Sequence, residues 1–144
     1  MKIINIRVES LYVLGLLFLT MTFLSPYFLS ISNMLNILLA TSVIGILAIG
    51  ATFVISSAGL DLSIGSVMGF AGVAGAVTMN ILELNWFFGV LSCLIAGMFA
   101  GYINGQLVTK AKIPAFIVTL GMLGIARGAA LLLCDGKPIY GLSN

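Results

Sequence analysis

The stretch WFFGVLSCLIAGMFAGYINGQLV, residues 86–108, contains no charged side chain and is long enough to cross a lipid bilayer as one helix. Residues 10–60, 62–82 and 84–109 are equally free of charge. A charged side chain at the centre of a membrane helix costs about 2.5 to 3.5 kcal/mol on insertion scales, so charges are confined to the ends of spans. The pattern predicts an all-α, polytopic integral membrane protein.

The composition of the whole chain agrees with this prediction. Hydrophobic residues make up 61% of the 144 residues and charged residues 7%, and the mean hydropathy is +1.25. Soluble domains have about 45 to 50% apolar and about 25% charged residues. We expect a single transmembrane domain covering 1–144, in which glycine-rich faces pack five spans together. The spans are expected at about residues 11–29, 34–58, 64–81, 86–108 and 115–133.

Several functional classes find no support in the sequence. The net charge of +2 comes from scattered basic residues, which does not match the basic patch of a nucleic-acid-binding protein. There is no histidine, and Cys93 and Cys134 stand far apart, so we expect no metal site. Gly136 and Lys137 lack the rest of a phosphate-binding loop, and no base or carboxylate pair suggests catalysis. We expect no catalytic residue, no bound cofactor and no enzymatic activity in this chain.

Basic residues in the loops predict the orientation in the membrane. With five crossings, Lys2, Arg7, Lys110 and Lys112 fall on one side and Lys137 on the other. Positive residues accumulate in cytoplasmic loops. The sequence therefore predicts a cytoplasmic N-terminus.

Small residues recur at helical spacing in three of the expected spans. In lipid, helices pack closely where small side chains let their backbones approach. The expected packing residues include Gly97, Gly101 and Gly105, which continue the spacing of Gly89 and Cys93. The span at 64–81 has Gly65, Gly69, Gly72 and Ala76 on one face, and the span at 115–133 has Gly121, Gly124 and Gly128. These faces are interpreted either as packing surfaces alone or as surfaces along which helices move during transport.

The motif GLDLSIGS, Gly59–Ser66, interrupts two long apolar runs and contains two candidate functional residues, Asp61 and Ser63. Either side chain is suited to cap the exposed N–H groups at the start of the following helix. In the other interpretation the motif is a re-entrant segment whose backbone lines a polar cavity. The sequence leaves both open.

Two polar residues inside expected spans are further candidates. Arg127 lies six residues from the end of its span, about 9 Å at the rise of an α-helix. It either extends outward to the surface or contributes to a translocation path. Asn104, near Gln106, either hydrogen-bonds to another helix or contacts substrate. We expect no pair between Arg127 and Asp61, because a simple topology places them toward opposite faces.

The motif GLDLSIGS, together with GYINGQLVTKAKIPAFIVTLGMLGIARGAALLLCDGKPIYGLSN at Gly101–Asn144, closely resembles the membrane permease subunit of bacterial ribose-type ABC importers. The resemblance implies a monosaccharide importer, with ribose the first candidate. It also implies three kinds of partner: a second permease copy or the missing C-terminal half, a cytoplasmic ATPase subunit, and a periplasmic sugar-binding protein.

The chain departs from this family in length. Family members are considerably longer, and the loop that resembles their ATPase-docking segment is not in this sequence. An alternative interpretation is therefore a truncated half-permease that acts only in membrane assembly or interaction, without transport. The DNA downstream of codon 144 would distinguish a remnant from a split subunit.

Overall fold

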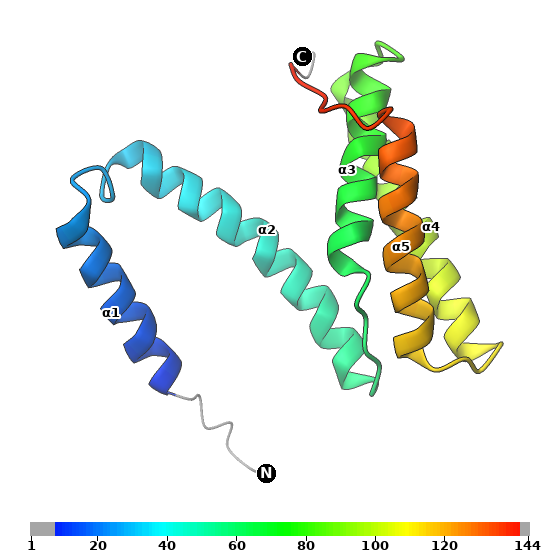
Figure 1. Ribbon diagram of the computed structural model, residues 1–144, viewed down its shortest axis with the longest axis horizontal. Coiled ribbons are helices and arrows are strands. Elements are labelled where there is room, and N and C mark those ends of the chain that lie inside the picture. The colour runs from blue at the N-terminus through cyan, green and yellow to red at the C-terminus, as the bar shows by residue number, and fades with distance from the viewer. Residues whose placement is uncertain (1–7, 142–144) are drawn as a thin grey trace. The chain divides into compact units, whose positions relative to one another are not determined.

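The computed structural model describes residues 8–141, which form five α-helices and no strand (Figure 1). The all-α prediction is confirmed. The helices are α1 (Val8–Leu24), α2 (Ile31–Ser56), α3 (Ile64–Asn80), α4 (Trp86–Thr109) and α5 (Ala115–Leu133).

Three of these helices, α2, α4 and α5, are long and apolar enough to cross a membrane. The apolar part of α1, Ser10–Leu24, and helix α3 are shorter. Large apolar side chains such as Phe53, Leu94 and Ile125 are more than half exposed. Exposed apolar side chains of this kind are stable in contact with lipid but not in contact with water. The architecture is therefore that of a polytopic membrane protein.

The first two helices differ in extent from the expected spans. α1 ends at Leu24, five residues before the expected end, because Pro26 disfavours a helical conformation in the residue before it. α2 begins at Ile31, three residues before the expected start. There Ser30 acts as a cap, since its Oγ accepts a hydrogen bond of 3.3 Å from the backbone N–H of Asn33.

The chain divides into two compact units, residues 1–46 and 47–144, with the division inside α2. In the first unit the rings of Phe18 and Phe28 meet edge to face at 5.0 Å. Asn33 Nδ2 donates a hydrogen bond of 2.7 Å to the carbonyl of Phe28. These two contacts hold the turn between α1 and α2 in shape.

In the second unit α3 packs against both α4 and α5 (Figure 1). Its core contains Ala100 of α4 and Met122 and Ala126 of α5, all of them buried. Three partly buried side chains pack around this core: Val67, Phe70 and Ile103. Because the core side chains are mostly small, the three helices approach closely.

The tightest approach between α3 and α4 lies at Gly75 and Gly89. A Cβ atom on Gly75 would clash with Cys93 Sγ and would lie 2.9 Å from the carbonyl oxygen of Gly89. A Cβ atom on Gly89 would lie 3.3 Å from the carbonyl oxygen of Gly75. Only glycine fits at this crossing, which therefore depends on both residues.

The expected packing stripe of α4 is only partly used within this chain. Gly89 and Cys93 lie at the contact with α3, but a Cβ atom on Gly97, Gly101 or Gly105 would meet no atom within 4 Å. Within the described residues, these three glycines therefore contact no neighbouring helix. The close crossing with α3 occurs where the stripe begins, so the rest of it remains open. Packing of this open part against another chain stays a prediction.

Candidate functional site

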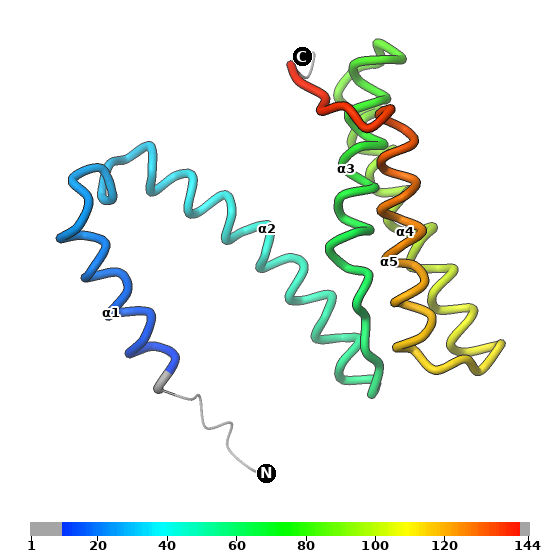
Figure 2. The backbone as a smooth tube through the Cα atoms, viewed as in Figure 1, coloured from blue at the N-terminus to red at the C-terminus, as the bar shows by residue number. Residues whose placement is uncertain are grey.

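The segment 57–63 between α2 and α3 is not helical and runs extended toward the start of α3 (Figure 2). α2 ends because Ala58 adopts a left-handed conformation with a φ of +57°. The backbone N–H of Gly59 then donates a hydrogen bond of 3.0 Å to the carbonyl of Val54, which closes the helix end. The GLDLSIGS motif thus begins directly after a helix terminus.

Asp61 and Ser63 bind each other within this segment. Asp61 Oδ1 accepts a hydrogen bond of 2.7 Å from the backbone N–H of Ser63 and one of 2.6 Å from its hydroxyl. Ser63 is the N-cap residue of α3, but its side chain makes no capping bond to the first turn of that helix. The expectation that Asp61 or Ser63 caps α3 is wrong, because the carboxylate of Asp61 accepts from Ser63 itself and the Ser63 hydroxyl accepts from no N–H group of the first turn.

Asn104 of α4 extends this arrangement into the protein. Its Nδ2 donates a hydrogen bond of 3.0 Å to Ser63 Oγ. Ser63 is 1% exposed and Asn104 is 7% exposed, so the bond is shielded from the surroundings. The hydroxyl of Ser63 has a single proton, which it gives to Asp61, and it can therefore only accept from Asn104. This order of donors fixes the orientation of the Asn104 amide.

The other end of the Asn104 amide lacks a partner. Its Oδ1 is buried and accepts no hydrogen bond within the described residues. An unpaired buried acceptor costs free energy, typically about 1 to 3 kcal/mol. The network Asp61–Ser63–Asn104 is therefore complete on one side and open on the other.

Thr119 of α5 holds the extended segment from a second direction. Its hydroxyl lies 3.2 Å from the carbonyl oxygen of Leu60 and 2.9 Å from that of Ala115, one turn earlier in α5. Thr119 is 3% exposed. Both α4 and α5 thus contact the segment, through Ser63 and Leu60 respectively.

These contacts place non-helical backbone beside the spans. Asn104 lies five residues before the end of α4 at Thr109, about 7 Å along the helix. Irregular backbone is tolerated at such a depth only where protein or water covers it. Here α4 and α5 provide part of that cover, so the motif is more than a loop at the membrane surface.

Arg127 does not belong to this network. It lies on α5 in a groove of about 400 Å³ between α5 and the first half of α3. The groove is lined by Leu62, Gly65, Ser66, Gly69, Leu123, Arg127 and Ala130. Arg127 is exposed and makes no hydrogen bond or ion pair within the described residues. Within the described residues it is not paired with Asp61, whose carboxylate binds Ser63.

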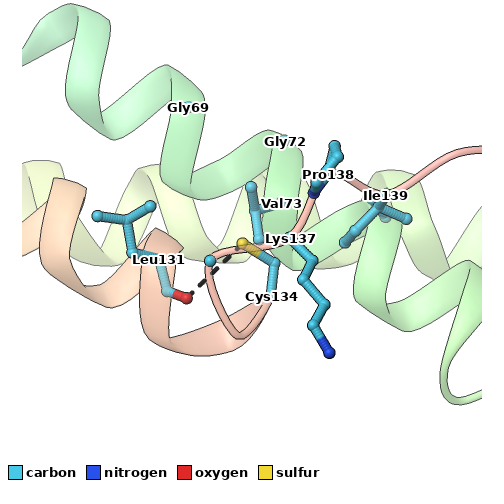
Figure 3. Close-up of a pocket in the computed structure, with 10 residues that line it drawn as sticks. Gly69, Gly72, Val73, Leu131, Cys134, Lys137, Pro138 and Ile139 are labelled. Carbon is cyan, nitrogen blue, oxygen red and sulfur yellow. Dashed lines mark hydrogen bonds between the residues drawn. The ribbon is translucent and has the colours of Figure 1, made fainter.

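A second cavity of about 550 Å³ continues along α3 beneath the residues that follow α5. It shares one lining residue, Gly69, with the groove at Arg127, and we call the two cavities together the α3–α5 groove. Figure 3 shows Gly69 and Gly72 on one wall of this part and Cys134 and Lys137 opposite. Cys134 Sγ donates to the carbonyl of Leu131 at 3.7 Å. The groove thus has one cation in each of its two parts, Arg127 and Lys137.

Sequence reasoning missed two residues of this region, Thr119 and Gly75. Thr119 occurs in an apolar run, where a hydroxyl usually bonds to its own helix, so no local signal separates it from a structural residue. Gly75 falls outside the series of fours from which the packing faces were inferred. The described residues contain no group of three or more potential metal ligands.

Comparison with known proteins assigns this sequence to a family. A family model for the permease component of branched-chain amino acid transport systems matches residues 33–137. The chain belongs to this permease family. The matched range includes the extended segment, the Asp61–Ser63–Asn104 network and Arg127.

Relatives of this permease are components of import systems. The ribose import permease of Haemophilus influenzae is 42% identical over 134 residues, covering 93% of this chain and 41% of the relative. The ribose import permease of Escherichia coli K12 is 38% identical over 131 residues, 91% of this chain and 40% of the relative. An autoinducer 2 import permease of Photorhabdus luminescens is 37% identical over 140 residues, 97% of this chain and 42% of the relative.

The chain therefore spans about two fifths of the length of these curated relatives. No solved structure matches the chain. Family membership and the apolar helices identify this permease as a multi-pass protein of the inner membrane. Lys2 and Arg7, on which the predicted orientation partly depends, lie outside the described residues.

Proposed function

We propose that this chain is a transmembrane part of an ABC importer that moves a monosaccharide, with ribose as the first candidate, across the inner membrane. The observation that carries the proposal is the similarity to two ribose import permeases over more than nine tenths of this chain. The autoinducer 2 permease is nearly as similar, so the proposal extends to small hydroxylated molecules of that kind.

The residues of this chain support a role in which another subunit binds and hydrolyses ATP. The described residues include no cluster of metal ligands, and the full sequence lacks a phosphate-binding loop. In the proposed importer a separate cytoplasmic ATPase binds the nucleotide, and a periplasmic sugar-binding protein delivers the sugar. This chain supplies helices to the translocation path, together with a second permease copy or a C-terminal half.

The break between α2 and α3 suits a protein that alternates between two openings. In transporters, substrate sites occur where spans are interrupted and their backbone is covered by neighbouring helices. Asp61, Ser63 and Asn104 form the polar contact at such an interruption, and Arg127 lines the nearby groove. We propose these four residues as candidates for the translocation path.

Sugar uptake tests the proposal directly. Cells that lack their own ribose importer would receive this chain together with the ATPase and binding-protein genes of a ribose importer. Accumulation of radiolabelled ribose should exceed that of cells without the chain and should require an intact ATPase. Unlabelled ribose, a second pentose and autoinducer 2 as competitors would rank the possible substrates.

The same experiment tests the alternative of an assembly protein without transport. In that case the chain would co-purify with the ATPase but no sugar would accumulate, even with every partner present. A chain that neither transports nor associates with the ATPase would contradict the importer proposal altogether.

A further inference from the structure

The α3–α5 groove contains an unpaired cation inside a membrane span. Arg127 lies six residues before the end of α5, about 9 Å along the helix axis. It has no partner within the described residues, although it lines a groove of about 400 Å³. Something outside the described chain must therefore solvate the guanidinium group.

Acyl chains do not fit this requirement. A guanidinium group in contact with hydrocarbon loses its hydration and gains nothing in return. An apolar helix seated in the groove would have the same effect, since it would bury Arg127 without an acceptor. The group that solvates Arg127 must bring hydrogen-bond acceptors.

The polar side chains of the groove are donors. Arg127 offers five N–H groups, Lys137 offers three, and Ser66 adds a hydroxyl. No acidic side chain lines either part. A surface of this kind complements a molecule rich in oxygen atoms, such as a solute with several hydroxyl groups, accompanied by water.

The wall formed by α3 leaves room for such a solute. A Cβ atom on Gly65, Gly69 or Gly72 would meet nothing within 4 Å, so this face of α3 is open and its backbone is approachable. The two parts of the groove, about 400 and 550 Å³, are of the size of small-molecule sites. Figure 3 shows Gly69 and Gly72 facing the residues that follow α5.

We propose that the α3–α5 groove is a water-filled binding site for a small hydroxylated solute, in which Arg127 is the main hydrogen-bond donor. The inference rests on the proposed function, because it assigns the solute of that importer to a particular surface. It also gives the glycines of α3 a role that differs from helix packing, since they form the open wall of the site.

Cysteine labelling tests whether the groove contains water. Ser66→Cys lies in the groove, whereas Met68→Cys lies two residues away on the same helix, at a side chain that is 45% exposed outside the groove. Both would be made in a chain in which Cys93 and Cys134 are replaced by alanine. A charged methanethiosulfonate reagent, applied to vesicles of both orientations, should modify Ser66→Cys at least about tenfold faster than Met68→Cys.

Protection by a solute tests whether the groove binds. Ribose at millimolar concentration should slow the modification of Ser66→Cys, and mannitol or another solute that is not transported should have no effect. Equal, slow labelling at both positions would show that lipid or another helix fills the groove and would overturn the inference. Rapid labelling without protection, in a chain that imports ribose, would also overturn it while leaving the proposed function intact.

Arg127 variants test the named donor. Arg127→Gln should raise the KM of ribose uptake by about tenfold or more, as expected for the loss of a charge-assisted hydrogen bond, and should weaken protection at Ser66→Cys equally. Arg127→Lys should recover part of the affinity. If Arg127→Gln reduces the amount of assembled importer and leaves KM and protection unchanged, Arg127 binds a partner helix and the inference fails. Protection by ribose without any uptake would instead contradict the proposed function alone.

Discussion

Asn104 Nδ2 lies 3.0 Å from Ser63 Oγ, and this hydrogen bond joins α4 to the start of α3 across 41 positions of sequence. It is made between two buried side chains, and it continues to the carboxylate of Asp61. In an otherwise apolar bundle, this contact fixes the position at which the extended segment 57–63 becomes a helix. The polar residues of the GLDLSIGS motif therefore act as a unit with a residue of a distant helix.

Ser63→Ala should destabilise the protein more than a surface substitution would. It leaves the Asn104 amide with both of its polar ends buried and unpaired, at a cost of about 1 to 3 kcal/mol. The measurement is the free energy of unfolding in mixed detergent micelles, followed by circular dichroism. The double variant Ser63→Ala with Asn104→Leu removes all the unpaired groups and should recover part of the loss. Additive effects of the two single variants would contradict the contact.

Thr119→Val tests the second contact of the extended segment. Valine has nearly the shape of threonine but cannot donate to the carbonyl of Leu60, so the variant should lose about 0.5 to 1.5 kcal/mol of stability. It should also make the segment more accessible to a protease. Thr119→Ser retains the hydroxyl and serves as the control. Identical proteolysis of both variants would show that the bond to Leu60 does not hold the segment.

The sequence predicted the helical class and the number of helices because the signal for a membrane span is strong and local. A charge-free run such as 86–108 can be recognised as a span from its own residues, without information about the helices beside it. Helix ends were harder to predict. Ala58 ends α2 through a left-handed conformation that alanine rarely adopts, and Ser30 begins α2 as a cap between two expected spans.

The candidate site was predicted only in part, for a physical reason. Asp61, Ser63 and Asn104 were recognisable singly, as polar residues in an apolar chain, but their contact depends on how α4 packs beside α3. The role of the glycines was equally hidden. The series of fours at Gly97, Gly101 and Gly105 has the spacing of a packing face, but nothing in the spacing says which other helix, in which chain, would fill it.

Gly75→Val should separate α3 from α4. A Cβ atom at this position would clash with Cys93 and press on the carbonyl of Gly89, so the variant should lower stability by about 1 to 3 kcal/mol. Gly72→Val is the matched control, since it lies one turn away where a Cβ atom meets nothing within 4 Å. Thermal unfolding in detergent compares the two. Because Cys93 provides the nearest contact, Cys93→Ala should partly rescue Gly75→Val, and a lack of any difference between Gly75→Val and Gly72→Val would contradict the crossing.

Gly101→Leu should leave the folding of this chain unchanged and impair its association with another subunit. The space beside Gly101 is open within the described residues, so a leucine side chain meets no obstacle there. If a second permease copy or half packs on this stripe, leucine would push the two backbones apart. Gly15→Leu, at an equally open glycine of α1 that lies outside the three glycine faces, is the control. Cross-linking in membranes measures association, and normal cross-linking of Gly101→Leu would remove the packing role of the stripe.

Reporter fusions should place the turn between α3 and α4 outside the cell and the turn between α4 and α5 inside. The second turn contains Lys110 and Lys112, whereas the first contains Glu83 and no basic residue, and positive residues are retained on the cytoplasmic side. Alkaline phosphatase joined after Glu83 should therefore be active, and green fluorescent protein joined after Lys112 should be fluorescent. Replacing both lysines by glutamine should weaken this preference, because it removes the positive charges that hold the turn inside. Fluorescence after Glu83 together with phosphatase activity after Lys112 would reverse the predicted orientation, and would place the end of the α3–α5 groove at Lys137 on the cytoplasmic side.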